Sequence, residues 1–251
     1  MNMVRPKKNL GQHFLRDQNI ARKIVDSLSG VTSDVLEVGP GMGVLTRFLL
    51  QKPALNVHLV EIDCESVEYL KIHFPELTER LYKQDFLQWD AGPLTGSFSI
   101  IGNLPYNISS QIFFRILEWR NRVPEVVCMV QKEVALRLSA PPGTKSYGIL
   151  SVLLGAFYEI EYLFSVSEQV FIPPPKVKSA VIRLRRNQVE KLPCNEELFF
   201  HTVKAAFNKR RKMLRNSLNK PGMELPEQFA EKRPEQLSVA DFVQLTKILE
   251  P

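Results

Sequence analysis

The residue types best suited to chemistry lie in one tetrapeptide, Asn103-Leu104-Pro105-Tyr106, which follows an apolar run predicted to be a strand. The amide oxygen of Asn103 accepts a hydrogen bond from an amine, and Pro105 restrains the turn while leaving the Leu104 carbonyl as a second acceptor. Tyr106 offers a ring on which a flat base can stack. Two acceptors beside a stacking ring suit the exocyclic amine of adenine. The alternative is an ordinary loop, since Asn and Pro are common turn residues.

A second candidate is the glycine-rich turn at residues 39–43, which follows a predicted strand at residues 35–38. Its glycines, Gly39 and Gly41 among them, let the backbone approach a ligand closely. Val44 stands where a dinucleotide fingerprint has its third glycine, and no Lys-Ser/Thr pair follows as a phosphate loop requires. The turn therefore predicts a ligand that does not bind here through a phosphate.

Two acidic residues each follow a predicted strand. Glu61 ends a strand at residues 57–60, where the ribose hydroxyls of a nucleoside would lie, and a bidentate contact there contributes about 1.5–3 kcal/mol. Asp85 ends a third strand at residues 84–86 and is placed to accept a hydrogen bond from a cofactor adenine. The alternatives are a solvated strand-end acid for Glu61 and a turn residue for Asp85.

The elements that must position these groups alternate along the chain. Further strands are predicted at residues 98–101 and 126–130, and helices at residues 17–28, 44–50, 64–74, 110–119 and 133–138. This alternation predicts an α/β fold with a doubly wound, mostly parallel sheet, whose ligands bind at the carboxyl ends of the strands. Late strands at residues 157–166 and 180–184 are expected as an antiparallel pair at the sheet edge.

A rigid segment separates these two late strands. Phe171 is followed by three prolines in the run Phe171-Ile172-Pro173-Pro174-Pro175-Lys176, which fixes an extended backbone that cannot join a central strand. The segment is able to hold the Phe171 ring over a pocket. The alternative is a rigid connector with Phe171 buried in the core.

The pattern changes to helices alone near residue 188. A helix is predicted to begin at Asn195 and to end at Pro221-Gly222, and a capping box at residues 238–241 opens the last helix. We therefore predict one domain at residues 1–187 and a small, all-helical C-terminal domain at residues 188–251.

The net charge of +6 is concentrated in two segments. Residues 1–23 hold six Lys/Arg against one acid, and residues 201–220 hold seven and no acid, so the rest of the chain is net negative. Such blocks indicate either a solvated face or a nucleic-acid footprint, and two blocks far apart in the chain favour the footprint. Residues 1–15 have no helical or strand period, so this basic arm is expected to lie along the body without forming an element.

Cysteine and histidine spacing argues against a metal site. The three cysteines, Cys64, Cys128 and Cys194, are widely separated, as are the four histidines, which predicts no bound metal and fits a reducing compartment. Residues 1–25 lack the apolar core of a signal peptide, and no run of about 18 apolar residues exists. A cytoplasmic protein that does not bind a membrane is therefore expected.

These motifs together carry a family resemblance. The segment at residues 37–43 resembles the first motif of class I S-adenosylmethionine-dependent methyltransferases, and residues 103–106 resemble the amine-methylating motif of the adenine-specific members. The whole set resembles the KsgA-type ribosomal RNA adenine dimethyltransferases over roughly residues 8–220. The other matching motifs are Gly11-Gln12-His13-Phe14-Leu15, Gln131-Lys132-Glu133, Tyr147-Gly148, Phe171-Ile172-Pro173-Pro174-Pro175-Lys176-Val177 and Phe207-Asn208-Lys209-Arg210-Arg211-Lys212.

The resemblance implies a seven-stranded Rossmann-like methyltransferase sheet. It also implies S-adenosylmethionine as cofactor, a helical RNA-binding domain and dimethylation of two adjacent adenosines near the 3′ end of small-subunit ribosomal RNA, within a pre-ribosomal particle and by a monomer. Catalytic roles are implied for Asn103, Leu104, Pro105, Tyr106 and Phe171. Cofactor binding is implied for His13, Leu15, Gly39, Gly41, Glu61, Asp85 and Asn103. The two basic segments supply the RNA-binding candidates Lys7, Lys8, Lys209, Arg210, Arg211, Lys212 and Arg215.

Other functions are compatible with the same motifs. A large-subunit adenine methyltransferase of the antibiotic-resistance type shares the core, although the basic stretch at residues 208–215 favours the small-subunit enzymes. A DNA adenine methyltransferase and a non-catalytic RNA-binding assembly factor are further alternatives, and intact Glu61, Asp85 and Asn103 argue against the second. A nicotinamide-dependent enzyme is the most distant alternative.

Overall fold

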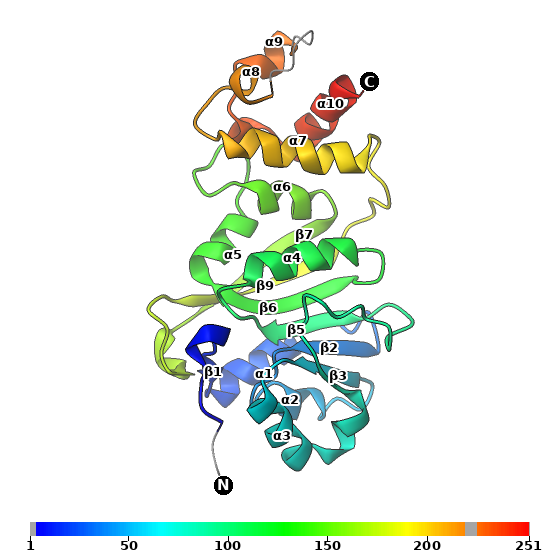
Figure 1. Ribbon diagram of the computed structural model, residues 1–251, viewed down its shortest axis with the longest axis vertical. Coiled ribbons are helices and arrows are strands. Elements are labelled where there is room, and N and C mark those ends of the chain that lie inside the picture. The colour runs from blue at the N-terminus through cyan, green and yellow to red at the C-terminus, as the bar shows by residue number, and fades with distance from the viewer. Residues whose placement is uncertain (1–3, 219–224, 251) are drawn as a thin grey trace. The chain divides into compact units, whose positions relative to one another are not determined.

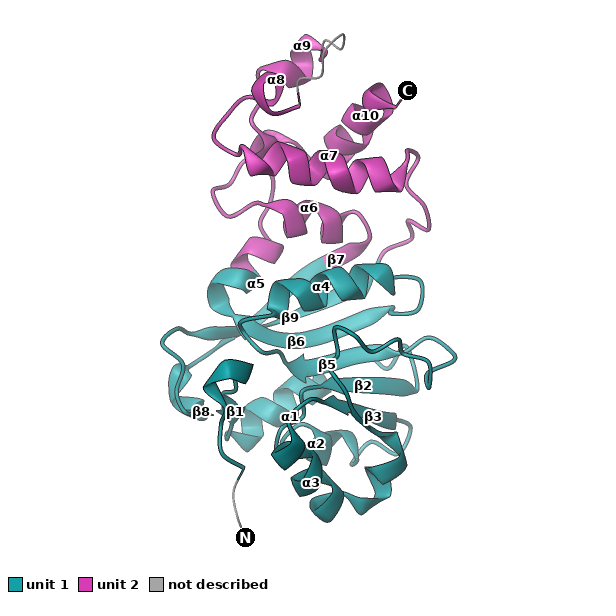
Figure 2. Cartoon of the chain, viewed as in Figure 1, with its two compact units in different colours: residues 1–135, 160–186 teal, residues 136–159, 187–251 magenta. Residues whose placement is uncertain are grey.

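The computed structural model describes residues 4–218 and 225–250. The chain forms two compact units, shown in separate colours in Figure 2. The first unit comprises Met1–Ala135 and Ile160–Arg186, and the second comprises Leu136–Glu159 and Asn187–Pro251. The candidate site residues outside the second basic segment all belong to the first unit.

A seven-stranded sheet forms the centre of the first unit (Figure 1). Its strands, in spatial order, are β4 (Leu81–Lys83), β3 (Asn56–Glu61), β2 (Asp34–Val38), β5 (Ser99–Asn103), β6 (Glu125–Gln131), β9 (Ser179–Arg186) and β7 (Tyr158–Val166). The first five strands run parallel, and β9 pairs antiparallel with β6. The prediction of a mostly parallel, Rossmann-like sheet is confirmed.

The two late strands are neighbours at one end of the sheet, as expected. Strand β9 is inserted between β6 and β7, and only β7 is terminal. Burial explains this order, because residues 179–182 and 184 of β9 are all buried, as an internal strand requires, whereas most of β7 is exposed or half-buried.

Helices follow the strands in the predicted alternation. They are α1 (Gln18–Asp26), α2 (Thr46–Leu49), α3 (Cys64–His73), α4 (Ser109–Glu118) and α5 (Lys132–Leu138). Helix α1 begins where expected because the Asp17 carboxylate caps it, accepting hydrogen bonds from the backbone N–H groups of Asn19 and Ile20. Apolar residues of α1, α2 and α3 pack with strand residues into one buried core cluster.

Two predicted boundaries near the glycine turn and Asp85 are wrong. The helix expected at residues 44–50 is reduced to the four residues of α2, and turns precede it. The third strand, β4, ends at Lys83, so Asp85 lies in the following loop rather than in the strand. Asp85 still follows the carboxyl end of a parallel strand, which is the placement that matters for ligand binding.

The described part of the basic arm, residues 4–15, is more ordered than its sequence predicts. It contains the 3-10 helix η1 (Lys8–Leu10) and the short strand β1 (Phe14–Leu15). Strand β1 pairs antiparallel with β8 (Phe171–Ile172), which lies just after the 3-10 helix η3 (Glu168–Val170). The pairing partner lies more than 150 residues away, so no local pattern in the sequence predicts this pairing.

The second unit is mainly helical. Its elements are α6 (Ile149–Gly155), α7 (Glu196–Asn208), α8 (Leu214–Ser217), α9 (Glu227–Ala230), the 3-10 helix η4 (Pro234–Gln236) and α10 (Val239–Leu249). Phe207 and Phe242 stack between α7 and α10, with ring centroids 6.0 Å apart. The predicted capping box of α10 is present, since Ser238 and Asp241 exchange hydrogen bonds. The helix predicted to begin at Asn195 does so but ends at Asn208, and the stop predicted at residues 221–222 lies outside the described residues.

Candidate functional site: a pocket at the carboxyl edge of the sheet

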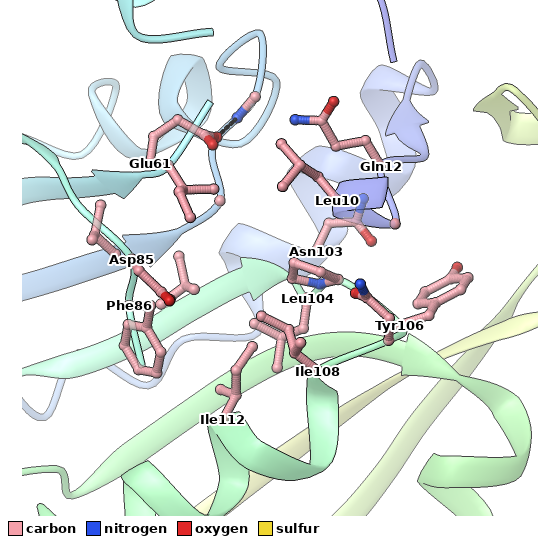
Figure 3. A pocket seen from close by; sticks show the side chains of 18 of the residues that line it. Leu10, Gln12, Glu61, Asp85, Phe86, Asn103, Leu104, Tyr106, Ile108 and Ile112 are labelled. Atoms are coloured by element: carbon pink, nitrogen blue, oxygen red, sulfur yellow. Dashed lines mark hydrogen bonds between the residues drawn. The ribbon is translucent and has the colours of Figure 1, made fainter. Parts of the chain in front are cut away.

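One pocket opens where β2, β3 and β5 end, and the basic arm forms its opposite wall (Figure 3). Its walls come from residues 9–14 of the arm, the glycine turn, the segments after β3 and β4, and the tetrapeptide after β5. Of the predicted site residues it brings together His13, Gly39, Gly41, Glu61, Asp85, Asn103, Leu104, Pro105 and Tyr106.

The glycine turn requires its glycines. Gly39 has φ +66°, and a Cβ built there meets nothing within 4 Å, so the backbone faces open space. Gly41 has φ +56°, and a Cβ there would come within 2.7 Å of the Phe14 ring of the arm. The turn therefore combines an accessible backbone at Gly39 with close packing against the arm at Gly41.

Glu61 is the buried carboxylate of the pocket, with 4% of its surface exposed. Its Oε2 accepts a hydrogen bond from the Gly41 backbone N–H at 3.0 Å, drawn in Figure 3, and its Oε1 accepts from Asp63 N–H at 2.9 Å. Burial raises the Glu61 pKa, while these backbone donors oppose that shift. Each carboxylate oxygen has a second lone pair, so the group is fixed in place and still able to accept from a diol.

A second buried carboxyl group, Glu37, lies beneath the glycine turn. The Thr46 hydroxyl donates to its Oε2 at 2.6 Å. Burial, with a smaller contribution from the Glu61 charge, raises the Glu37 pKa to about 8. Glu37 therefore retains its proton at neutral pH, where a carboxyl group in the unfolded chain has lost it.

This difference gives the free energy of unfolding a pH dependence. The folded state binds one more proton than the unfolded state between about pH 4.5 and 8, so stability falls with rising pH by up to about 1.4 kcal/mol per pH unit. We expect Glu37→Gln, which is neutral and similar in shape, to remove much of this slope. Urea unfolding of both proteins from pH 5 to 9 measures it, and parallel pH profiles would contradict the assignment.

The orientation of the Asn103 amide is set by the arm. Its Nδ2 donates to the His13 backbone carbonyl at 2.8 Å, and a carbonyl accepts only from the nitrogen end of an amide. Asn103 Oδ1 is buried and has no hydrogen-bond partner. A buried acceptor without a donor is costly in a folded protein and marks a position where a ligand donor is expected.

Tyr106 is held in place from two sides. Its hydroxyl hydrogen-bonds the hydroxyl of buried Ser179, and its ring stacks on the His13 imidazole with centroids 5.4 Å apart. Burial raises the Tyr106 pKa, so the phenol stays neutral. His13 in turn uses Nδ1 to donate to the Pro173 carbonyl at 2.8 Å. The Tyr106 ring thus stacks on His13 where it lines the pocket.

Phe171 and Leu15 are not part of this pocket. Phe171 is 2% exposed and packs in the core cluster, which favours the buried-connector alternative, and its role as a clamp on a base stays a prediction. Its pairing with Leu15 in the β1–β8 ladder turns the ring inward. Leu15 is 5% exposed and lines a smaller neighbouring pocket with Glu37, Gly39 and Asn103. Any contact that Leu15 makes with a ligand is therefore in this smaller pocket.

Sequence reasoning missed the apolar walls. Ile62 is 48% exposed immediately after Glu61, and Phe86 follows Asp85, so each acid is paired with an apolar neighbour at the pocket. Figure 3 shows Asp85 and Phe86 on one side of the pocket and Asn103 and Tyr106 on the other. An isoleucine directly after a strand-end acid was the signal for Ile62 available in the sequence. The structure therefore adds apolar surfaces on which a flat ring can lie.

The predicted RNA-binding cations fall into two groups. Lys8, Arg211 and Lys212 are exposed, as are Lys209 and Arg215, although Lys209 contacts the Asn216 carbonyl and Arg215 pairs with Glu231 at 3.4 Å. Arg210 and Lys7 are engaged within the protein. Arg210 donates to the carbonyls of Thr144 and Lys145 and faces Glu235, and Lys7 pairs with Asp63 and Glu65.

Neither a metal site nor a membrane span is found in the described part of the chain. No three His, Cys, Asp or Glu side chains among residues 4–218 and 225–250 come together as metal ligands would. Within the same residues, every helix is too short or too polar to cross a bilayer.

Comparison with known proteins agrees with this geometry. Residues 3–250 match the model of a family described as ribosomal RNA adenine dimethylase. A protein of Flavobacterium johnsoniae named ribosomal RNA small subunit methyltransferase A is 54% identical, covering 100% of this chain and 98% of the relative. A protein of the same name from Parabacteroides distasonis is 55% identical, over 99% of this chain and 95% of its own length.

Solved structures show the same fold. A dimethyladenosine transferase from Plasmodium falciparum superposes with a TM-score of 0.77 at 24% identity, covering 93% of this chain and 96% of that one. The 23S rRNA methyltransferase ErmE gives a TM-score of 0.68 at 27% identity, over 93% of this chain and 99% of its own. Since the family model spans nearly the whole sequence, this chain belongs to the ribosomal RNA adenine dimethylase family.

Proposed function

We propose that this enzyme transfers methyl groups from S-adenosylmethionine to the exocyclic amines of two adjacent adenosines near the 3′ end of small-subunit ribosomal RNA, two groups to each. Family membership supports the reaction class. The choice of small-subunit RNA is supported by identities of 54–55% to relatives named for that subunit, against 27% to ErmE. The large-subunit enzyme thus remains the less favoured alternative.

The pocket fits the proposed cofactor. Glu61 suits the ribose hydroxyls, Asp85 suits the adenine amine, and Ile62 and Phe86 offer apolar surface to the ring. Gly39, with open space in front of its backbone, suits the methionine portion, beside His13 and Leu15. The cofactor supplies a methyl group activated by a positively charged sulfur.

One observation supports the catalytic assignment above all others: the buried, unpaired Oδ1 of Asn103. The amine of a target adenosine is the donor that this oxygen lacks. Adenine's amine nitrogen is a poor nucleophile because its lone pair is delocalised into the ring. Hydrogen bonds to Asn103 Oδ1 and the Leu104 carbonyl favour the pyramidal nitrogen instead, and Pro105 keeps the two acceptors in a fixed turn.

Tyr106 would bind the base of the extruded adenosine. Its ring can stack on the base at the pocket, while His13 and Ser179 hold it. Stacking of this kind contributes about 1–3 kcal/mol per base. That offsets part of the few kcal/mol needed to unstack the nucleotide.

The experiment that tests the proposal uses labelled cofactor and small ribosomal subunits lacking the modification. We expect two adjacent adenosines near the 3′ end to acquire two labelled methyl groups each, mapped by nuclease digestion and mass spectrometry. Large subunits incubated in parallel identify the alternative enzyme. Absence of transfer to either subunit, with RNA still bound, would support the non-catalytic assembly factor instead.

The exposed cations predict a graded salt response. If Arg211 and Lys212 each contact one phosphate, Arg211→Ala/Lys212→Ala should reduce the slope of log affinity against log salt by about 1.4, or roughly 0.7 per contact for single-stranded RNA. Arg210→Ala serves as the comparison, because Arg210 holds residues 144–145 and its loss should lower the melting temperature more than the slope. RNA binding titrations from 50 to 300 mM salt measure the slopes, and an unchanged slope for the double variant would contradict the contact.

Four further aspects stay predictions. A cytoplasmic location is expected from the proposed ribosomal substrate. The RNA is expected to be methylated within a pre-ribosomal particle. Action as a monomer and RNA binding by residues 188–251 are likewise expected on the resemblance alone.

A further inference from the structure

The basic arm is attached to the body on both sides of the pocket. At its far end Phe14 and Leu15 pair with Ile172 and Phe171 of β8. At its near end Lys7 contacts Asp63, which caps the start of α3 just after the strand that carries Glu61. Residues 9–14 between these attachments line the pocket. A ligand in the pocket is therefore enclosed by a segment held at two points.

Asp63 is the centre of the near attachment. Its side chain is fully buried and accepts from the Lys7 ammonium, from Gln12 Nε2 at 3.2 Å and from Ser66 Oγ at 3.0 Å. Burial alone would raise the Asp63 pKa, but the hydrogen bonds from Lys7, Gln12 and Ser66 outweigh it and hold the pKa below its usual value. Asp63 is consequently ionised at neutral pH, and its charge is matched by an arm residue 56 positions earlier.

Gln12 adds a second contact between the arm and Asp63, and it also bonds the backbone of Lys7. Its Oε1 accepts from the Lys7 backbone N–H at 2.8 Å, and its Nε2 donates to Asp63. The intervening turn needs Gly11, which has φ +63° and lies so near Asn107 that a Cβ would approach Asn107 Oδ1 to 2.7 Å. The conformation of residues 7–12 is therefore fixed around Asp63.

The same residue also fixes the cofactor-facing carboxylate. The Asp63 backbone N–H donates to Glu61 Oε1, opposite the Gly41 donor to Oε2. Asp63 thus joins two walls of the pocket, the arm through its side chain and Glu61 through its backbone. Asp63 is itself absent from the pocket lining, so it acts through these neighbours.

We propose that Asp63, Lys7 and Gln12 form a latch that holds residues 7–13 over bound S-adenosylmethionine, so that the cofactor leaves when the latch opens. Asp63 is a positioning residue, and Lys7 serves the cofactor site instead of an RNA phosphate. The inference rests on the proposed cofactor. It predicts a slow cofactor dissociation rate that depends on the Lys7 charge.

The test measures cofactor dissociation from the full-length protein, by chasing labelled S-adenosylmethionine with excess unlabelled compound. We expect Lys7→Met to increase the dissociation rate on the order of fivefold. Lys7→Arg, which keeps the charge, should restore most of the retention. The matched control is Lys71→Met, since Lys71 is an exposed lysine of α3 that pairs with Glu68 and lies outside the pocket lining, and its cofactor dissociation rate should equal that of the wild type.

Steady-state kinetics separate the latch from the earlier RNA-binding assignment. The latch predicts that Lys7→Met raises KM for the cofactor and leaves KM for RNA unchanged, whereas a phosphate contact predicts the reverse. A double variant with Asp63→Asn should dissociate no faster than Asp63→Asn alone, because both changes break one contact. Melting curves confirm that each variant is folded, and the Lys7 variants alone decide the question if Asp63→Asn does not fold.

Failure of this inference is distinguishable from failure of the proposed function. If the wild type does not bind S-adenosylmethionine, the proposed function is wrong. If the wild type binds it and methylates RNA, but Lys7→Met keeps the wild-type dissociation rate, the latch alone is wrong. Effects of the Lys7 and Asp63 changes that multiply independently would also overturn the latch.

Discussion

Asn103→Ala should lower kcat about a hundredfold to a thousandfold, with cofactor and RNA both saturating. The substitution removes the buried Oδ1 that has no partner within the protein, and with it one of the two acceptors proposed for the adenosine amine. Losses of this size follow removal of a single positioned hydrogen-bonding group that acts in the transition state of other enzymes. Single-turnover transfer of labelled methyl groups to small subunits measures it directly.

The matched control for this variant is Asn56→Ala. Asn56 is exposed at the first residue of β3, the end of the strand opposite the pocket, so its loss should leave kcat unchanged. Asn103→Asp is informative as well. It keeps an acceptor oxygen but replaces the donor to the His13 carbonyl with a second oxygen, so it should be nearly as slow as the alanine variant. Near-normal kcat for Asn103→Ala would refute the role assigned to this amide.

Tyr106→Ala should lower kcat/KM for RNA by about tenfold to a hundredfold, with little change in cofactor affinity. The stack expected between the ring and the target base is worth about 1–3 kcal/mol, and each 1.4 kcal/mol is a factor of ten. Tyr106→Phe keeps the ring and loses only the bond to Ser179, so its kcat/KM should stay within a few-fold of the wild type.

Tyr162→Ala provides the control for loss of a tyrosine elsewhere in the same unit. Tyr162 lies in β7, outside the pocket lining, where its hydroxyl bonds Ser165 at 2.6 Å. A Tyr106→Phe variant as impaired as Tyr106→Ala would show that the hydroxyl, and not the ring face, carries the effect. The stacking role would then be wrong.

The sequence predicted those parts of the site that follow from strand ends. Glu61 and Asn103 are the last residues of two parallel strands, and Asp85 follows a third. The carboxyl ends of such strands meet at one edge, so nine predicted residues lie around one pocket. The glycine turn was equally visible, because glycine adopts the positive φ values found there without the steric cost that other residues meet. These signals are local in the sequence, and the parallel sheet brings the residues that carry them together at one edge.

The errors concern contacts between residues far apart in the chain. Three prolines predict a stiff segment but do not say which way Phe171 points, and its pairing with Leu15 across more than 150 residues decides that. Lys7 and Arg210 read as free cations, because their partners Asp63 and Thr144 lie 56 and 66 positions away.

The dependence of the Asn103 amide on the His13 carbonyl has a consequence for inhibition. A backbone oxygen supplies that contact, so any side chain at position 13 preserves it, while a shift of the backbone there abolishes it. A small molecule wedged between residues 9–13 and the loop after β5 would free the amide to rotate. Such a compound would stop methylation without imitating either the methyl donor or the nucleobase.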